Sequence, residues 1–526
     1  MKVVKSLLLG TAAGLIAVGG AQAADLPLKA KAVEYVKICS LYGAGFYYMP
    51  GTDTCIKLGG YVRADAIFGG AGDYGFNQNA PTSSNNGGSN NRLTNYFYTR
   101  ARMDLNVDTR TATEYGVVRT YADMIFSYDT VTGTQNTSAP TGGTSFGGGG
   151  ATLGLYHAFI QFAGFTFGRT VSIFDAPWQS YPAGGPDTIP GGSNHVNGIN
   201  QLAYTADFGQ GITGSIALEE ETSANNGQSN LWNVNGFSAS GSVSGSTGLP
   251  TVTSASAAAA AALIQGQYGV NDWGGTRVPD ITGAVRVDQA WGLAQLSVAA
   301  HDLHAGYYGS TEPSGHPSDK WGWAVQGSLS IKNIPTGAGD NINLQAVYTD
   351  GATRYNFQSL FPQSFFMFSG SGSAYQSVGF AGLADGVFGT GTGIDTVKTW
   401  GVRGSYTHNW SPYWASAIYG GYASASYGST GKSLICANFA AIANPGATCN
   451  PDFNFGVLGV NTVWTPVKNL AFTADVSWSR LDQKYSGTIT TPSTPNGFAS
   501  AAKPAAVYEL KDQNSVTMML RAQRNF

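Results

Sequence analysis

The segment from Thr99 to Arg110 alternates between two kinds of side chain. Every second residue is ionised or strongly polar, and the set consists of Arg100, Arg102, Asp104, Asn106, Asp108 and Arg110. The residues between them carry no charge. Because successive side chains of a β-strand point to opposite faces, the two sets lie on opposite sides of one strand. Such a strand fits a sheet that meets lipid on one side and water on the other.

The same alternation recurs along the chain, with apolar residues facing one way and polar or charged residues facing the other. It is clear in Ile56–Phe68 and Tyr115–Phe126, and further segments follow with less sharply marked ends. In all, the sequence predicts 16 strands, at 56–68, 99–110, 115–126, 153–163, 165–173, 201–207, 212–220, 281–289, 293–301, 321–332, 342–350, 396–408, 413–424, 454–464, 470–481 and 514–526.

The connections between these strands alternate in length. Long Gly/Ser/Asn-rich loops separate pairs of strands whose own connection is a short turn, and several loops exceed the length usual in a compact soluble domain. The short turns are expected near Thr111, Gly164, Gly209, Trp291, Pro335, Pro412 and Pro466. This pattern predicts an all-β fold over 55–526, a transmembrane antiparallel up-and-down barrel with turns at one rim and loops at the other. An even strand number leaves no open edge, and the spacing favours 16 strands over 14 or 18.

Composition supports this class and excludes others. Charged residues are only 11% of the chain, against about 25% in typical soluble domains, while Gly is abundant at 72 residues. The formal net charge of −3 gives no basic excess, so the sequence predicts no nucleic-acid partner.

The first 23 residues are typical of a secretory signal peptide. Lys2 and Lys5 precede the apolar run Leu7–Val18, and Ala21-Gln22-Ala23 is a small-residue cleavage site. A retained anchor is the alternative, but the run is too short to span a bilayer. We therefore expect residues 1–23 to be removed and 24–54 to form a periplasmic segment at the rim of the barrel.

Four cysteines in an exported chain suggest two disulfides. Three pairings are possible, and the economical one joins near neighbours, Cys39 with Cys55 and Cys436 with Cys449. No Cys-x-x-Cys or Cys/His spacing supports a zinc site.

Three segments resemble the alphaproteobacterial general porins. They are 36–63, with the two cysteines and Gly-Gly-Tyr-Val-Arg, Gly-Phe-Thr-Phe-Gly-Arg at 164–169, and the terminal Leu-Arg-Ala-Gln-Arg-Asn-Phe at 520–526. The resemblance implies a homotrimeric, 16-stranded channel for small hydrophilic solutes and ions in the bacterial outer membrane, surrounded by lipid and lipopolysaccharide. It also implies that Phe526 is part of the signal read by the outer-membrane assembly machinery. The loops near 221–280 and 351–395 look long for this family.

In this family the third long loop folds into the barrel and narrows it. Here that loop starts at Phe174, and its carboxylates are Asp175 and Asp187. The opposing wall would be basic, and its inward residues are expected to be Lys57, Arg63, Arg100, Arg102 and Arg119. Charged groups facing each other across water set ion selectivity. The alternative is that these cations pair with Asp65, Asp104, Asp108 and Asp123 on neighbouring strands, and both readings are compatible.

Arg169 differs from these arginines because it shares a face with Phe165 and Phe167. The resemblance places Arg169 at the subunit contact. The alternative is that it is an arginine at the end of a strand, near the rim of the barrel, without a role in subunit contact. The apolar band around Phe165 fits either lipid or a neighbouring subunit.

Other chemistry finds little support in the sequence. His301 and His304 would lie on opposite faces of a strand, which disfavours a metal site with His316, and no phosphate loop or nucleophile elbow is present. The sequence thus predicts no enzyme, cofactor or metal. A substrate-specific channel for a sugar or organic anion is the alternative function, although Tyr61, Tyr115 and Tyr121 are too few for an aromatic track. An adhesin role of the long loops is a second alternative, and weakly selective passive diffusion is preferred.

Overall fold

The computed structural model describes nine stretches of the chain, and the predicted signal peptide and Asp187 lie outside them. They are residues 37–69, 97–130, 150–178, 189–220, 229–235, 268–309, 311–357, 377–490 and 506–526. The chain divides into two compact units, 1–56 and 57–526. Each unit is described by itself.

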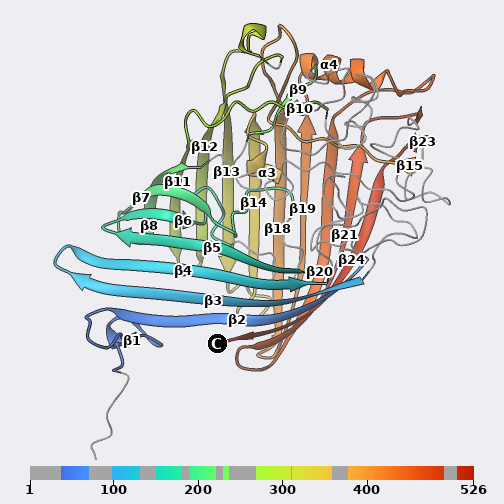
Figure 1. The fold of residues 1–526 in the computed structure, drawn as a ribbon. Coiled ribbons are helices and arrows are strands. Elements are labelled where there is room, and N and C mark those ends of the chain that lie inside the picture. Colours follow the sequence, from blue (N-terminus) through green and yellow to red (C-terminus); the bar gives the residue numbers. More distant parts are fainter. Residues whose placement is uncertain are drawn as a thin grey trace, which may run out of the picture. The chain divides into compact units, whose positions relative to one another are not determined.

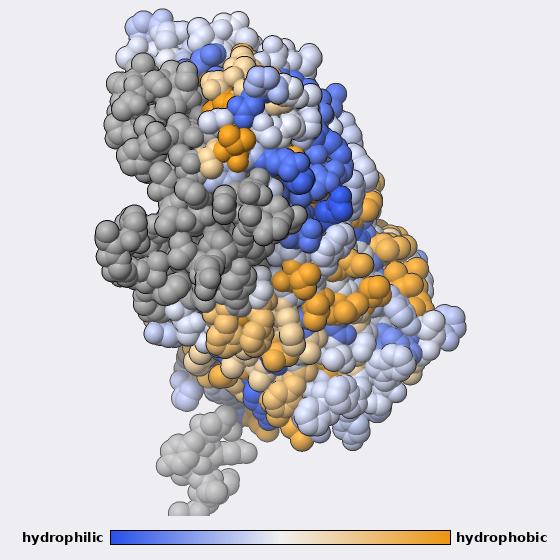
Figure 2. All heavy atoms as spheres, turned by 90° about the vertical axis from the view of Figure 1, so that its right-hand side faces the viewer, coloured by the Kyte–Doolittle hydropathy of each residue, from blue (hydrophilic) through white to orange (hydrophobic). Residues whose placement is uncertain are grey.

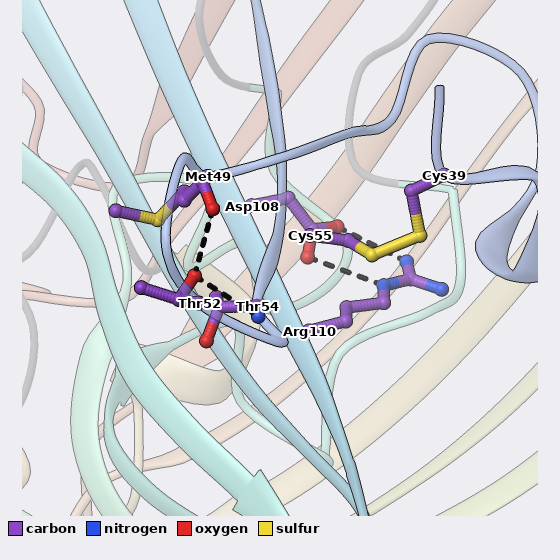
Figure 3. The surroundings of a disulfide bond; sticks show 7 residues. All are labelled: Cys39, Met49, Thr52, Thr54, Cys55, Asp108 and Arg110. Carbon is purple, nitrogen blue, oxygen red and sulfur yellow. Dashed lines mark hydrogen bonds and ion pairs between the residues drawn. A yellow bond between two sulfur atoms is a disulfide. The ribbon is translucent and has the colours of Figure 1, made fainter. Parts of the chain in front are cut away.

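The described part of the first unit is a small disulfide-linked fold. It contains η1 (Ser40–Tyr42), β1 (Tyr47–Tyr48) and the start of β2 (Cys55–Phe68), with β1 antiparallel to β2. The disulfide Cys39–Cys55 confirms the predicted pairing and packs with Phe46 in a buried core. In the turn that follows β1, the Thr52 hydroxyl donates to the Met49 carbonyl at 3.1 Å (Figure 3). The periplasmic placement of 24–54 stays a prediction.

The second unit is a closed antiparallel barrel of 16 strands, as predicted (Figure 1). The first strand, β2, pairs with the last, in register from Tyr61 opposite Asn525 to Phe68 opposite Met518. The other strands are β3 (Phe97–Thr113), β4 (Gly116–Asp129), β5 (Gly150–Phe162), β6 (Phe165–Thr170), β7 (Ile199–Asp207), β8 (Ile212–Glu219), β11 (Asp280–Gln289), β12 (Gly292–Leu303), β13 (Lys320–Lys332), β14 (Asn341–Asp350), β18 (Lys398–Ser411), β19 (Trp414–Ser426), β20 (Phe453–Val467), β21 (Leu470–Gln483) and β24 (Gln513–Asn525).

The alternation of short turns and long loops is confirmed, with local differences. The turn expected near Thr111 lies at Glu114-Tyr115, because β3 continues to Thr113, so Tyr115 is an exposed turn residue and does not face inward. Pro466 is inside β20 at an irregular register, where a residue without an N–H is tolerated. The strand expected at 165–173 ends at Thr170, where the chain leaves the sheet.

The outward face of the barrel carries two rows of aromatic residues. Trp414, Trp464 and Phe472 lie near the short turns, with Trp414 and Trp464 stacked at 5.8 Å between ring centroids. Near the loop ends, Trp323 contacts Tyr348 and Trp400 contacts Tyr422. Amphipathic rings favour the two membrane–water interfaces. Figure 2 shows the apolar residues gathered in the lower part of one face of the molecule and hydrophilic residues above them.

The loops at the opposite end from the short turns build small elements of their own (Figure 1). These are β9 (Leu231–Asn233), β10 (Val270–Asn271), η3 (Glu312–Ser314), α3 (Arg354–Phe357), β15 (Ser377–Val378), β16 (Gly386–Phe388), β17 (Asp395–Thr396), α4 (Ser429–Phe439), β22 (Thr488–Thr490) and β23 (Val507–Leu510). Several of them contribute to an apolar core that includes Trp232, Phe380 and Ile435. The same core contains Phe455 and Leu481 of the barrel, so loops cover the inner wall of β20 and β21 near this end. Among the described residues no helix has the length and apolarity to cross a membrane.

The disulfide Cys436–Cys449 also confirms the predicted pairing, and it ties α4 to the chain that follows it. The double substitution Cys436→Ser and Cys449→Ser should destabilise this loop locally by about 3 kcal/mol, since the bond closes a short loop. We expect proteolysis within 429–452 to accelerate while the barrel stays folded. The matched control, Cys39→Ser with Cys55→Ser, should leave this loop protected. Equal cleavage in both variants would contradict the local role.

Candidate functional site

The described parts of the loop between β6 and β7, 171–178 and 189–198, lie inside the barrel and are largely buried against its inner wall. Phe174 is fully buried and packs with Ala299, Ala324 and Val347, which are inward residues of β12, β13 and β14. Its ring also contacts Tyr355 of α3 at 4.4 Å between centroids. This loop therefore covers one wall of the lumen.

Hydrogen bonds to its backbone hold the loop in this position. The Gln326 side chain donates to the Phe174 carbonyl at 2.9 Å, and Gln295 donates to the Asp175 carbonyl at 2.8 Å. On the other arm, Arg403 of β18 donates to the Ser193 carbonyl at 2.6 Å. Gly191 has φ +100°, and a Cβ there would clash with the Val402 carbonyl. Only glycine fits this approach of two backbones.

Asp175, predicted to face the lumen, is buried beside His195 of the same loop. Its Oδ1 lies 2.9 Å from His195 Nδ1, and its Oδ2 accepts from the His195 backbone N–H. Burial by itself would raise the pKa of Asp175, but His195 and the hydrogen bonds hold that pKa below its ordinary value. The Asp175 carboxylate therefore links segment 171–178 of the loop to segment 189–198.

Charged side chains line the opposite wall, on β2, β3 and β4. Arg63 donates to Gln523 at 2.9 Å, and Arg102 donates to Ser127 at 2.9 Å. Arg100 pairs with Asp129. Each contact joins neighbouring strands at the same height of the barrel. Lys57 also lies on β2 and is exposed.

Asp108 is the centre of a second group on this wall. It pairs with Arg110 at 3.0 Å and with Arg119 at 3.0 Å, and Figure 3 shows the contact with Arg110. The Arg119–Asp108 pair agrees with the alternative given in the sequence analysis, in which inward cations pair with carboxylates of neighbouring strands. Across the barrel closure, Arg521 donates to Asp65 at 2.6 Å. The sequence did not reveal Arg521, Gln523 or Asp129 as partners, because strand register decides which inward residues meet.

Positive and negative groups on this wall nearly balance. The inward cations of β2, β3, β4 and β24 are Arg63, Arg100, Arg102, Arg110, Arg119 and Arg521. The inward carboxylates of β2, β3, β4 and β21 are Asp65, Asp104, Asp108, Asp123, Asp129 and Asp475. The wall is therefore a mosaic of both signs and not a purely basic ladder.

A buried ionic network fixes two loops to the barrel near the long-loop end. Arg354 of α3 lies 2.8 Å from Asp280 and 3.8 Å from Glu219, and all three are 0–1% exposed at the side chain. His301 lies 2.6 Å from the other oxygen of Asp280. The Ser172 hydroxyl donates to Glu219 at 2.8 Å. This network could not be predicted from the sequence, because its members come from loops and strand ends far apart in the chain.

The remaining predicted site residues lie on the outside or at the end of the chain. Arg169 lies 3.3 Å from Glu220 and also donates to the Leu155 carbonyl. Phe526 is exposed, and its backbone N–H donates to the Gly60 carbonyl at 3.0 Å. Their roles in subunit contact and assembly stay predictions. Within the described stretches, no cluster of three His, Cys, Asp or Glu residues has a geometry for a metal ion.

Comparisons of the sequence with known proteins agree on one family, the porins. A family model described as the porin subfamily matches residues 25–519. Porin Omp2a of Brucella canis is 36% identical over 230 residues, which are 41% of this chain and 56% of that protein, so the match spans little more than half of the relative. Porin Omp2b of Brucella canis is 30% identical over 363 residues, which are 66% of this chain and 85% of that protein.

A solved structure, the outer membrane channel DcaP of Acinetobacter baumannii, is similar in fold. It aligns with a TM-score of 0.53 and 14% identity, covering 91% of this chain and 99% of that one. At this identity the likeness supports the fold alone.

Replacing Arg354 by Met should destabilise the packing of α3 on the barrel by about 3–5 kcal/mol, because Asp280 and Glu219 would stay buried without the guanidinium that pairs with both, although His301 remains beside Asp280. Thermal unfolding followed by semi-native electrophoresis measures the change. Arg480→Met is the matched control, since the Arg480–Asp512 pair is largely exposed and should contribute at most about 1 kcal/mol. Equal shifts in both variants would argue against the buried network.

Because the pKa of Asp175 is lowered, its ionised form stabilises the docked loop above the ordinary carboxyl pKa, and this contribution is lost as pH falls through the lowered pKa. Asp175→Asn should therefore reduce amide protection in 171–178 and 189–198 at pH 7. Hydrogen exchange, corrected for intrinsic rates, checks this, and the wild type should approach the variant under strongly acidic conditions. Asp53→Asn, at an exposed turn, is the control and should change nothing there.

Proposed function

Because the chain belongs to the porin subfamily, we propose that it is a passive diffusion channel for small hydrophilic solutes and ions. It is an outer-membrane β-barrel protein, and its 16-stranded fold has the architecture expected of such a channel. The family indicates a channel and not an enzyme; that the protein lacks catalytic activity is part of the proposal.

One observation carries the proposal: the two sides of the lumen differ in character. On one side the described loop segments 171–178 and 189–198, together with other loops, cover the inner wall of β12–β21. On the other side the charged and polar residues of β2–β5 stay partly exposed, such as Arg110 and Arg119 at about 30% of the side chain. Water and solutes would pass between the docked loop and this polar wall.

The charge pattern supports weak selectivity. The polar wall carries nearly equal numbers of cations and carboxylates, and most of its arginines have partners on the next strand. Buried Asp175 is engaged with His195 and contributes little field across the lumen. We therefore propose that Arg63, Arg100, Arg102, Arg119 and Lys57 line the path without imposing a strong preference for anions.

We further propose that the channel is a homotrimer with β5–β8 at the subunit contact. β6 has 6 residues and β8 has 8, fewer than the 9–11 or so that cross a bilayer. The outward side chains there are apolar and exposed, including Phe167 and Ile216. Between residues 57 and 231 the sequence has one tryptophan, Trp178 in the inward loop, so this face lacks the interfacial tryptophans of the other side. Arg169, at this face, is a natural member of the contact.

Other partners follow from the membrane. Outer-membrane lipid and lipopolysaccharide would surround the faces with aromatic rows, and Phe526 would present the terminal aromatic residue to the assembly machinery. The adhesin role of the long loops stays a prediction.

Single-channel recording in planar bilayers tests the proposal. We expect conductance steps in groups of three, and a small reversal potential under a salt gradient because the polar wall is nearly neutral. A protein without its signal peptide, refolded as a heat-modifiable oligomer, is the material, and heat-denatured protein is the control. Absence of any conductance would refute an open channel, and a reversal potential near that of an ideally selective pore would refute weak selectivity.

A further inference from the structure

Strands β3, β4 and β5 place an aromatic pair in the polar wall of the lumen. Tyr121 of β4 lies directly opposite Phe159 of β5, and their rings are stacked at 5.4 Å between centroids with 29° between the planes. Both residues are half-buried. Because they share the inward face with Asp108 and Arg119, the exposed part of this ring surface meets the lumen.

Hydrogen-bonding groups surround the rings on both sides. Arg119 lies 5.2 Å from the Tyr121 ring centroid and 5.4 Å from that of Phe159, while it also pairs with Asp108. The Tyr121 hydroxyl donates to Asn106 at 2.8 Å, and Gln161 accepts from Arg119 at 3.0 Å. Side-chain donors and acceptors therefore alternate around one apolar platform.

The register explains how this patch arises. Asp108 is opposite Tyr121, Asn106 is opposite Asp123, and Arg119 is opposite Gln161. Directly opposite residues of an antiparallel pair have neighbouring Cβ atoms, so three rows of three inward side chains form one surface. The middle row consists of Asp108, Tyr121 and Phe159, and the rows on either side of it are Arg110, Arg119 and Gln161, and Asn106, Asp123 and His157.

The charge of the patch distinguishes between ligand classes. Arg110 and Arg119 both pair with Asp108, and the second carboxylate of the patch, Asp123, lies 3.8 Å from His157. An organic anion would meet both carboxylates, and an organic cation would meet both arginines. A neutral ring with hydroxyl groups on its edge is repelled by neither set of charges. Each of its hydroxyls can both donate and accept a hydrogen bond, so it can bond the carboxylates as well as the arginines. A few placed polar groups around aromatic surface are typical of sites that orient a small neutral ligand.

We propose that this patch, centred on Tyr121 and Phe159, is a binding site for neutral cyclic sugars on the wall of the channel. The sugar would pack an apolar ring face against the part of the aromatic pair that Arg119 leaves open to the lumen, and its hydroxyls would bond Asp108, Asn106 and Arg119. The proposal rests on the proposed function, since the sugar reaches the patch only through an open lumen. It adds a solute class to a channel whose charges confer little selectivity.

The test records ion current through reconstituted channels while maltose is added, with sorbitol, an acyclic polyol, as the comparison solute. Maltose should cause transient interruptions or excess current noise that saturate with concentration, whereas sorbitol should not. Benzoate is the third probe. Interruption by benzoate alone would overturn the sugar assignment in favour of an organic anion, and equal effects of maltose and sorbitol would overturn a ring-binding site.

Substitutions assign the effect to the patch. Phe159→Leu keeps apolar volume but removes the ring, so the half-blocking maltose concentration should rise at least about fivefold. Phe159→Tyr keeps the ring and should stay within about twofold of the wild type. Tyr61→Leu, which removes an inward aromatic residue of β2 outside the patch, should leave the effect unchanged. An unchanged half-blocking concentration in Phe159→Leu would overturn the proposal.

A replacement variant and the conductance itself distinguish failure of the sugar site from failure of the channel function. If Phe159→Leu fails to insert, Tyr121→Leu replaces it, with the same expected rise. Normal conductance without interruption by maltose would overturn the sugar site and leave the channel function standing, whereas no conductance at all would refute the channel function itself.

Discussion

The hydrogen bonding of the backbone in a membrane is the constraint on which the rest of this structure depends. Hydrocarbon offers no partner to an open strand edge, so a sheet that crosses a bilayer must close. Here the closure is the pairing of β2 with β24, between the first and last strands of the barrel. Since that pairing also aligns Asp65 with Arg521 and Arg63 with Gln523, closure and the contacts of the polar wall are set by one register.

Closure also creates a wide interior, and the long loops fill only one side of it. A barrel of this size leaves room that its own side chains do not fill, and the chain uses its long loops to occupy one side. Phe174 packs on β12–β14, and the loops at the end opposite the short turns share an apolar core with β20 and β21. The opposite wall then remains wet, and most of its arginines bond a side chain of a neighbouring strand because partly buried charges need partners. The asymmetry of the lumen follows from where the loops dock.

Much of the fold could be predicted because a barrel strand has a local signature. Alternation with period two marks each strand, and loop length marks each rim, so all 16 strands and the order of turns and loops were predicted correctly. The errors were at ends, as at Thr111 and Pro466, where a strand continues through residues that usually mark a turn. The two disulfides were also predictable, because both close short loops.

The site was predictable in part. Periodicity alone showed that Arg63, Arg100, Arg102 and Arg119 face inward, since the face of a residue is a local property of its strand. Their partners depend on which residues of different strands lie at one height, and the sequence does not contain that register explicitly. For the same reason the pairing of Tyr121 with Phe159 could not be predicted from the sequence.

The sequence by itself thus determined the class of fold, the number of strands and the alternation of the two strand faces. Only the tertiary structure decided that Asp175 is fastened to His195, that Arg354 joins Asp280 and Glu219, and that one wall is covered while the other is open. The physical reason is the range of the interactions. Alternation is enforced residue by residue by water and lipid, whereas loop docking depends on contacts between segments that only the closed barrel brings together.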